Sequence, residues 1–230
     1  MIKYFSYIGK LLKKIEDFLI RYRIQTRLNK SKVKSNPESQ QLEVYYEESF
    51  ADELAFWGED NVWREIELLL ATKEGNVVDM CCGVGGTIRR LEKYKKLNIC
   101  GFDISDFLIQ SAIDAGIDQS KLKVANAIST GYEDNSFSYS YSIGSLEHFT
   151  EEDIDSFLKE TKRITTQGSF HQIPTARDEK FSGWLELDQS YYNMPESWWL
   201  EKFQKHFDDV QTIDSSWNDS ISFGTWFICK

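Results

Sequence analysis

The chain has 230 residues, enough for one α/β domain with a sizeable core and a small additional segment. Its 37 Asp and Glu residues outnumber 27 Lys and Arg, and the net charge of −10 argues against a general nucleic-acid-binding protein. The four cysteines have neither the spacing of a metal site nor that of a disulfide framework. We therefore expect a protein of the reducing cytoplasm.

The first segment, residues 1–36, differs in charge from the rest of the chain. Residues 1–34 hold ten Lys or Arg and two acids, a net charge of +8, which leaves −18 for the remainder. Apolar residues recur at helical spacing from Phe5 to Tyr22, which predicts a basic amphipathic helix followed by a linker. It is too often interrupted by charges to span a membrane. We expect residues 2–27 to bind an anionic membrane surface or a protein partner, or to dock on the following domain.

Residues 37–230 are expected to form the globular domain. After a helical pattern that ends near Ala71, strands alternate with helices, which implies right-handed crossovers and a parallel sheet. The predicted strands are Val77–Met80, Leu97–Phe102, Leu122–Ala125, Phe137–Ile143 and Gly168–Ile173. The predicted helices between them are Thr87–Lys96, Asp106–Ala115 and Glu151–Arg163, the last capped by Thr150. A helix from Pro195 to about His206 then leads into a hairpin-like pair, Val210–Asp214 and Ile221–Cys229.

The most informative stretch runs from Val77 to Gly86 and reads Val-Val-Asp-Met-Cys-Cys-Gly-Val-Gly-Gly. An apolar strand ends in an acid, and a glycine-rich turn leads into a helix. A second acid, Asp103, closes the next apolar run, 18 residues after Gly85. Glycines let a ligand approach the backbone, and a carboxylate after the second strand can accept both ribose hydroxyls. The pattern predicts a nucleotide-ribose pocket.

The residues around this turn also indicate which nucleotide it binds. A dinucleotide site has the pattern G-x-G-x-x-G, whereas Ile88 stands at the third glycine position here. Asp79 lies directly before the turn, where its charge would oppose a phosphate. An acid at this place suits a ligand with an ammonium and a sulfonium, namely S-adenosylmethionine. An ordinary strand–turn–helix of an α/β protein is the alternative explanation for the glycines alone.

These residues resemble the class I methyltransferases that use S-adenosylmethionine. The similar stretches are residues 78–85 and 101–105, which match the first two motifs of that family, and residues 135–149, which match its fourth strand. Cys81 stands where the family usually has glycine, Asn126 where it often has an acid near the adenine, and Ser138 where it commonly has Asp. The resemblance implies a doubly wound, mostly parallel seven-stranded sheet that is closed by the C-terminal antiparallel hairpin.

The resemblance also implies a role for each residue of the cofactor site. Asp79 is expected to orient the turn or to reach the methionine ammonium through water, and Gly83 and Gly85 to let the backbone pass the methionine. Asp103 is expected to bind the ribose. The remaining expected cofactor-binding residues are Cys81 in the turn, Ile104, Asn126 and Ala127 around the adenine, and Ile143 at the end of the fourth strand.

Two of the three histidines are candidates for the catalytic base. Methyl transfer to a hydroxyl requires removal of its proton, and histidine is a common base for such a step. His148 follows the fourth strand and His171 lies on the fifth, so both could face the site. The alternatives are a structural hydrogen bond for His148 and a core position for His171. No spacing of Asp, Glu and His dictates a metal site.

The acceptor is expected to be a small molecule or a glycan, with a sugar hydroxyl as the methylated group. The run from Glu196 to Phe203 and the sequence Leu146-Glu147-His148 are similar to those of methyltransferases in bacterial surface-glycan synthesis. The basic first segment would then suit a lipid-linked acceptor at the inner membrane face. Aromatic residues between Trp184 and Trp199 either bind the acceptor or anchor a helix to the core.

Two functions of other classes stay open from the sequence. One is an NAD-dependent or nucleotide-sugar oxidoreductase with a similar crevice. The other is a non-catalytic subunit with the same fold that binds a partner through its first segment. The acidic composition makes a nucleic-acid substrate the least expected partner.

Overall fold

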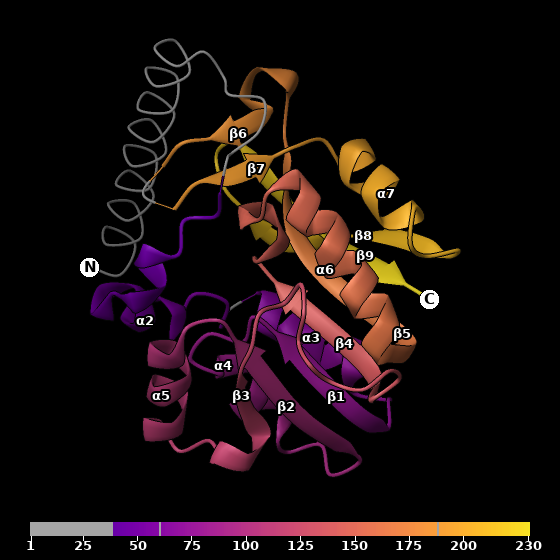
Figure 1. Ribbon diagram of the computed structural model, residues 1–230. Coiled ribbons are helices and arrows are strands. Elements are labelled where there is room, and N and C mark those ends of the chain that lie inside the picture. Colours follow the sequence, from indigo (N-terminus) through magenta and orange to yellow (C-terminus); the bar gives the residue numbers. More distant parts are fainter. Residues whose placement is uncertain (1–38, 60, 188) are drawn as a thin grey trace, which may run out of the picture.

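The computed structural model describes residues 39–59, 61–187 and 189–230, which form a seven-stranded sheet with helices on both faces (Figure 1). The amphipathic helix predicted within residues 1–36 lies outside the described residues. The strands of the sheet are β1 (Gly75–Met80), β2 (Leu97–Asp103), β3 (Leu122–Val124), β4 (Phe137–Ile143), β5 (Thr165–Ala176), β8 (Val210–Asn218) and β9 (Ser222–Cys229).

The helices and the short strands complete the described chain. The α-helices are α2 (Glu48–Leu54), α3 (Val62–Leu70), α4 (Gly86–Leu91), α5 (Asp106–Asp114), α6 (Glu151–Ile164) and α7 (Glu196–Gln204). The 3-10 turns are η1 (Glu43–Tyr46), η2 (Gln119–Lys121), η3 (Leu146–His148) and η4 (Glu179–Phe181). A separate two-stranded sheet consists of β6 (Gly183–Leu185) and β7 (Tyr191–Asn193). None of the helices in the described ranges is long and apolar enough to cross a membrane.

The sheet has the order β3-β2-β1-β4-β5-β9-β8. The first five strands of this order run parallel, and β9 is antiparallel to both of its neighbours. The expected mostly parallel sheet with a C-terminal antiparallel hairpin is therefore confirmed. From β1 the chain adds β2 and β3 on one side of the sheet and then returns to add β4 and β5 on the other side. Open α/β sheets bind ligands at such a reversal, which lies here between β1 and β4.

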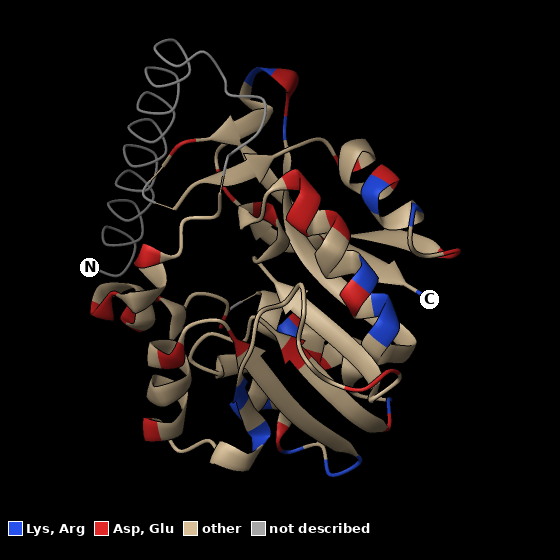
Figure 2. Cartoon of the chain, in the orientation of Figure 1, with Lys and Arg blue, Asp and Glu red and all other residues tan. Residues whose placement is uncertain are grey.

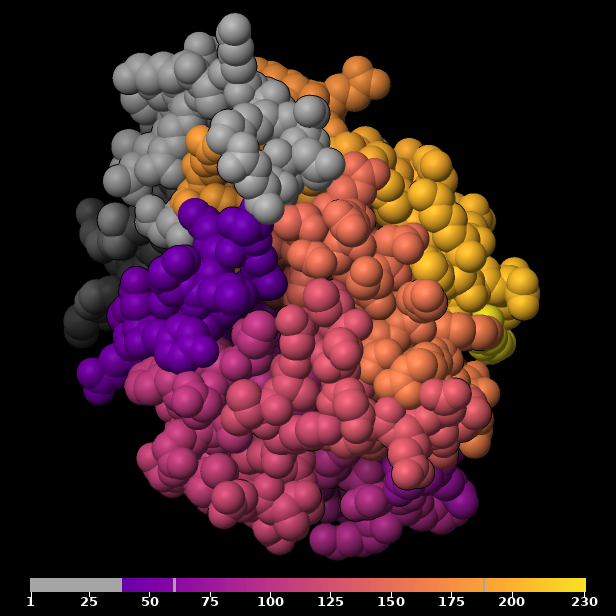
Figure 3. Space-filling model, in the orientation of Figure 1, coloured from indigo at the N-terminus to yellow at the C-terminus, as the bar shows by residue number. Residues whose placement is uncertain are grey.

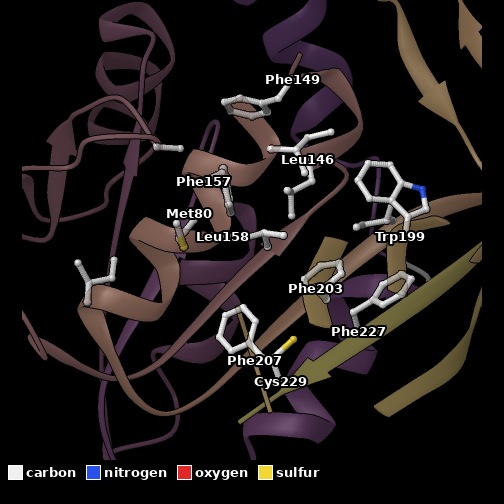
Figure 4. Close-up of a cluster of buried hydrophobic side chains, with 14 of the residues drawn as sticks. Met80, Leu146, Phe149, Phe157, Leu158, Trp199, Phe203, Phe207, Phe227 and Cys229 are labelled. Atoms are coloured by element: carbon white, nitrogen blue, oxygen red, sulfur yellow. The ribbon is translucent and has the colours of Figure 1, made fainter. Parts of the chain in front are cut away.

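Both faces of the sheet are covered, which explains why the last four residues of β1 are all buried rather than alternately buried and exposed. Val77 packs under α3, α4 and α5, whereas Val78 and Met80 point to the opposite face under α6 and α7. Figure 4 shows this second core, where Phe203 of α7 stacks on Phe227 of β9 with ring centroids 4.7 Å apart. The two cores fix β1 from both sides and hold its carboxyl end in place.

Helix α6 begins as the sequence predicts. The Thr150 hydroxyl accepts a hydrogen bond from the backbone N–H of Asp153 at 3.1 Å, and three acids follow in the first turn, where the helix dipole favours them. The helix ends at Ile164 and β5 begins at Thr165, so no loop separates them. Strand β5 is consequently longer than the predicted Gly168–Ile173.

Two other boundaries differ from the sequence prediction. The helix predicted for Thr87–Lys96 ends at Leu91, because Tyr94 turns away to donate its hydroxyl to Glu67 of α3 at 2.7 Å. Strand β8 continues to Asn218, four residues beyond the predicted end. The β6–β7 hairpin had no counterpart in the prediction, since each of its strands has only three residues.

Candidate functional site

A cavity of about 900 Å³, open to solvent, lies at the carboxyl ends of β1, β2 and β4. Its walls come from the β1–α4 turn, the residues after β2, β3 and β4, and the segment before the sheet that contains η1 and α2. Figure 3 shows this early segment, in indigo, against the magenta part of the domain. Eight of the nine predicted cofactor-binding residues line the cavity, namely Asp79, Cys81, Gly83, Asp103, Ile104, Asn126, Ala127 and Ile143.

The β1–α4 turn is shaped by residues with positive φ. Cys81 has φ of 62°, Gly83 of 52° and Gly85 of 72°, a region that favours glycine. Gly85 is the predicted cofactor residue that does not line the cavity. A Cβ at Gly85 would approach Cδ1 of Ile117 to 2.2 Å, so this glycine allows α4 to pack closely on the residues after α5. That Gly85 also lets the backbone pass the methionine stays a prediction.

Asp103 is held in position by the backbone around it. Its Oδ2 accepts the N–H of Gly83 at 2.9 Å, and its Oδ1 accepts the N–H of Ser105 at 3.0 Å. The first bond ties the end of β2 to the glycine turn after β1. The backbone N–H of Ile104 also bonds to this carboxylate, whose four acceptor sites still leave room for a hydrogen bond from a diol.

The cavity is electronegative. Asp79 is buried and accepts a hydrogen bond from the Thr87 hydroxyl, and burial, with a smaller contribution from nearby Asp103, raises its pKa to about 7. Burial likewise raises the pKa of Asp103. No Lys or Arg lines the cavity in the part of the chain that the structure describes. Figure 2 shows further acidic positions on α2 and α5 nearby. A cationic ligand fits this site, whereas a pyrophosphate would find no positive side chain.

The Asn126 side chain makes one hydrogen bond within its own loop. Its side-chain carbonyl oxygen accepts the backbone N–H of Ile128 at 3.1 Å. One lone pair of that oxygen and the two amide N–H donors stay available to the cavity. Asn126 can therefore meet either a donor or an acceptor on a heterocyclic ring.

His148 lines the same cavity as the two acids. Its Nδ1 lies 2.8 Å from the carbonyl oxygen of Ser190, an acceptor, so Nδ1 carries the proton and Nε2 is the open base. Burial lowers the pKa of His148 to about 4, so the ring is neutral at pH 7. The Nε2 atom lies 3.8 Å from Oε1 of Glu147. The Nε2 lone pair of His148 is thus available to accept a hydrogen bond or a proton.

His171 lies elsewhere and cannot contact a ligand in this cavity. Its side chain is completely buried on β5, between the rings of Phe157 and Phe203, which Figure 4 labels. Its Nδ1 is 2.8 Å from the Ser142 hydroxyl, and burial lowers its pKa to about 3. His171 thus occupies the core position that was the alternative to a catalytic role, and this burial argues against its acting as the base.

The aromatic residues of the cavity come from the part of the chain before β1. Tyr45, Phe50, Trp57 and Trp63 line it, together with polar residues such as Gln40 and Gln189. Those proposed for acceptor binding behave differently, since Trp184, Tyr192 and Trp199 are all buried in the core under α6 and α7. These large rings therefore stabilise the core and do not line the cavity.

Part of the chain is similar to known methyltransferases. Residues 77–168 match the family model of a methyltransferase domain, a stretch that begins in β1 and contains all residues of the cavity from Asp79 to Phe149. 24-Methylenesterol C-methyltransferase 2 of Arabidopsis thaliana is 28% identical over 109 residues, which are 45% of this chain. The chain thereby spans only 30% of the length of that curated relative.

Solved structures share the fold at low sequence identity. A SAM-dependent methyltransferase from Aquifex aeolicus superimposes with a TM-score of 0.58 at 15% identity, over 80% of this chain and 100% of that one. A Haemonchus contortus phosphoethanolamine N-methyltransferase in complex with S-adenosylhomocysteine does so with a TM-score of 0.60 at 16% identity, over 78% and 56% of the two chains.

The fold and the matched residues define the class. Residues 77–168 match a methyltransferase domain, and the sheet has the Rossmann-like order of the class I fold, whose cofactor is S-adenosylmethionine. The buried acids and the glycine turn fit this positively charged cofactor, as does the lack of Lys and Arg among the described residues that line the cavity.

Proposed function

We propose that this protein transfers a methyl group from S-adenosylmethionine to a hydroxyl of a small-molecule or glycan acceptor, with His148 as the base. One observation carries the proposal. The glycine turn and the acids expected to hold the cofactor line the same cavity as His148, whose Nε2 is unprotonated. The same cavity thus offers a place for the donor and a group that can take a proton from the acceptor.

On this proposal the chain mainly binds and orients. S-adenosylmethionine supplies a methyl carbon already activated by its positively charged sulfur, so catalysis can come largely from positioning. Asp103 would accept the ribose hydroxyls, with Ile104 against the adenine and Asn126 and Ala127 at its edge. Cys81 and Gly83 would line the methionine, and Asp79 would balance its ammonium. Ile143 would close the site at the end of β4.

His148 would accept the hydroxyl proton at Nε2 as the acceptor oxygen attacks. The hydrogen bond from Nδ1 to Ser190 fixes the tautomer and the ring orientation, so no proton has to move within the ring first. Because the ring is partly enclosed, water is kept from the nitrogen that takes the proton.

The first experiment tests cofactor binding. Calorimetric titration of the full chain with S-adenosylmethionine should give saturable binding, and Asp103→Ala should weaken it by about 1.5–3 kcal/mol, the worth of a lost hydrogen bond to a charged group. Asp106→Ala, an exposed acid three residues on, is the matched control and should bind normally. Unchanged affinity of Asp103→Ala would refute the ribose assignment, and binding of NAD instead would favour the oxidoreductase.

The second experiment tests catalysis. With labelled methyl donor and a panel of sugar acceptors, His148→Ala should slow turnover by about 100-fold or more without weakening cofactor binding. His206→Ala is the control, because His206 pairs with Asp155 on the surface at 2.9 Å. Full activity of His148→Ala would exclude it as the base. Cofactor binding without turnover on any acceptor would favour the non-catalytic subunit.

The finer part of the proposal concerns the acceptor and the location of the protein. The resemblance to surface-glycan methyltransferases and the net charge of +8 on residues 1–34 support a lipid-linked glycan at the inner membrane face, with the protein in the cytoplasm. Cosedimentation with anionic vesicles should be lost when residues 1–36 are removed. Equal binding by the shortened protein would refute the membrane role of residues 2–27 and leave a protein partner or the domain itself as their target.

A further inference from the structure

Glu147 is a buried acid beside the cavity to which the proposed function assigns no role. It precedes His148 in η3, and its side chain is only 5% exposed. In the described part of the chain its Oε2 has no hydrogen-bond partner, and its one ion-pair neighbour is the neutral His148. A carboxyl group in this state is expensive to keep ionised. Burial accordingly raises the pKa of Glu147 to about 8.

The carboxyl group and an indole ring converge on one point over Gly144, which lines the cavity. A Cβ at Gly144 would lie 3.6 Å from Oε1 of Glu147 and 3.3 Å from Cη2 of Trp57. Gly144 has φ of 60° and no side chain, so a position the size of one methyl group stays open between the ring, which lines the cavity, and the acid behind it. Trp57 itself lines the cavity and is 36% exposed, which leaves part of its ring accessible.

A carboxylate and an indole together recognise one kind of group. A protonated amine can pair with the carboxylate and lie against the ring, where a cation is attracted by the π electrons. An uncharged hydroxyl could accept or donate one hydrogen bond but could not offset the charge of a buried carboxylate. The nearby Nε2 of His148 places the reacting group of the acceptor within reach of the same spot.

We infer that Glu147 and Trp57 form an ammonium-binding subsite and that the acceptor is an amine-bearing small molecule or glycan, such as an amino sugar. The inference rests on the proposed function, since it concerns the acceptor half of the same cavity. Glu147 here determines specificity, while His148 stays the base.

The test uses matched pairs of probes that differ only in the amine. Glucosamine with glucose, and 2-phenylethylamine with 2-phenylethanol, are titrated into the full chain saturated with S-adenosylhomocysteine, with tryptophan fluorescence and calorimetry as readouts. The amine of each pair should bind about tenfold to a hundredfold more tightly at pH 7, the range expected of a charge-assisted hydrogen bond. The preference should disappear in Glu147→Gln and shrink in Trp57→Leu. Glu48→Gln, an exposed acid of α2, is the control and should keep it.

A second measurement separates recognition from a merely structural role. Binding of an amine to protonated Glu147 should release about one proton at pH 7, seen as a dependence of the binding heat on the buffer, and Glu147→Gln should release none. No preference for the amine in either pair, including no binding at all, overturns the inference, as does a preference that survives in Glu147→Gln. Titration with S-adenosylhomocysteine comes first, so a failure of the cofactor site is recognised separately from a failure of the amine subsite.

Discussion

Replacing Glu147 by Gln should make the ligand-free protein more stable, and the gain should depend on pH. The folded pKa of about 8 lies above the ordinary value of 4.5, so the native state binds the proton more tightly than the unfolded chain. Between these two pH values the wild type loses about 1.4 kcal/mol of stability for each pH unit of increase. Glutamine has the same shape and cannot ionise. At pH 7 the variant should therefore gain about 3 kcal/mol over the wild type.

The assay is urea or thermal unfolding of both proteins at pH 4.5 and pH 7. For a chain of this size the gain corresponds to an increase in Tm of about 6–12 °C at pH 7. At pH 4.5 the two proteins should differ little, because folded Glu147 is then protonated and the unfolded group is half protonated, which costs the wild type only about 0.4 kcal/mol. Asp79 also titrates in this range but is common to both proteins and cancels in the comparison. An equal difference at both pH values, or a less stable variant at pH 7, would refute the reasoning.

The remaining predictions concern the β1–α4 turn and its acid. Cys81→Gly should raise the free energy of unfolding by about 0.5–1 kcal/mol, because φ of 62° strains any residue with a Cβ. Gly85→Ala should lower it by about 2–3 kcal/mol through the same strain and the collision with Ile117, and chemical denaturation measures both. Affinity for S-adenosylmethionine should fall about tenfold for each pH unit below 7, because the cation requires ionised Asp79. Calorimetry from pH 5.5 to 8 tests this, and a flat profile would contradict the role of Asp79.

The order of the helices and strands, and most residues on the cofactor side of the cavity, could be predicted from the sequence. Strand β4 has the predicted bounds, Phe137–Ile143, because large apolar residues alternate with serine along it, which is the period of a strand. The paired acids Asp79 and Asp103 could be located because each lies directly after such a run. Helix α4 was predicted too long, since residues 92–96 contain no Gly or Pro to mark its end. The turn is explained by a contact between distant residues, the hydrogen bond from the Tyr94 hydroxyl to Glu67 of α3.

The acceptor side was harder to predict, because it depends on contacts between distant residues. Nothing in the local sequence distinguishes the tryptophans that line the cavity, Trp57 and Trp63, from the buried Trp199. The two histidines posed the same problem, since His148 and His171 both follow or lie on central strands. Only the direction of each side chain relative to the sheet separates a base from a core residue.

The walls of the cavity have different origins in the chain, and this has a consequence for how specificity can change. The glycine turn and Asp103 belong to the sheet and are joined by the Gly83–Asp103 hydrogen bond, whereas Tyr45 and Trp57 come from the segment before β1. That segment contributes no strand to the sheet. Substitutions within residues 39–59 would thus reshape one wall of the cavity while the strands that carry the acids stay unchanged.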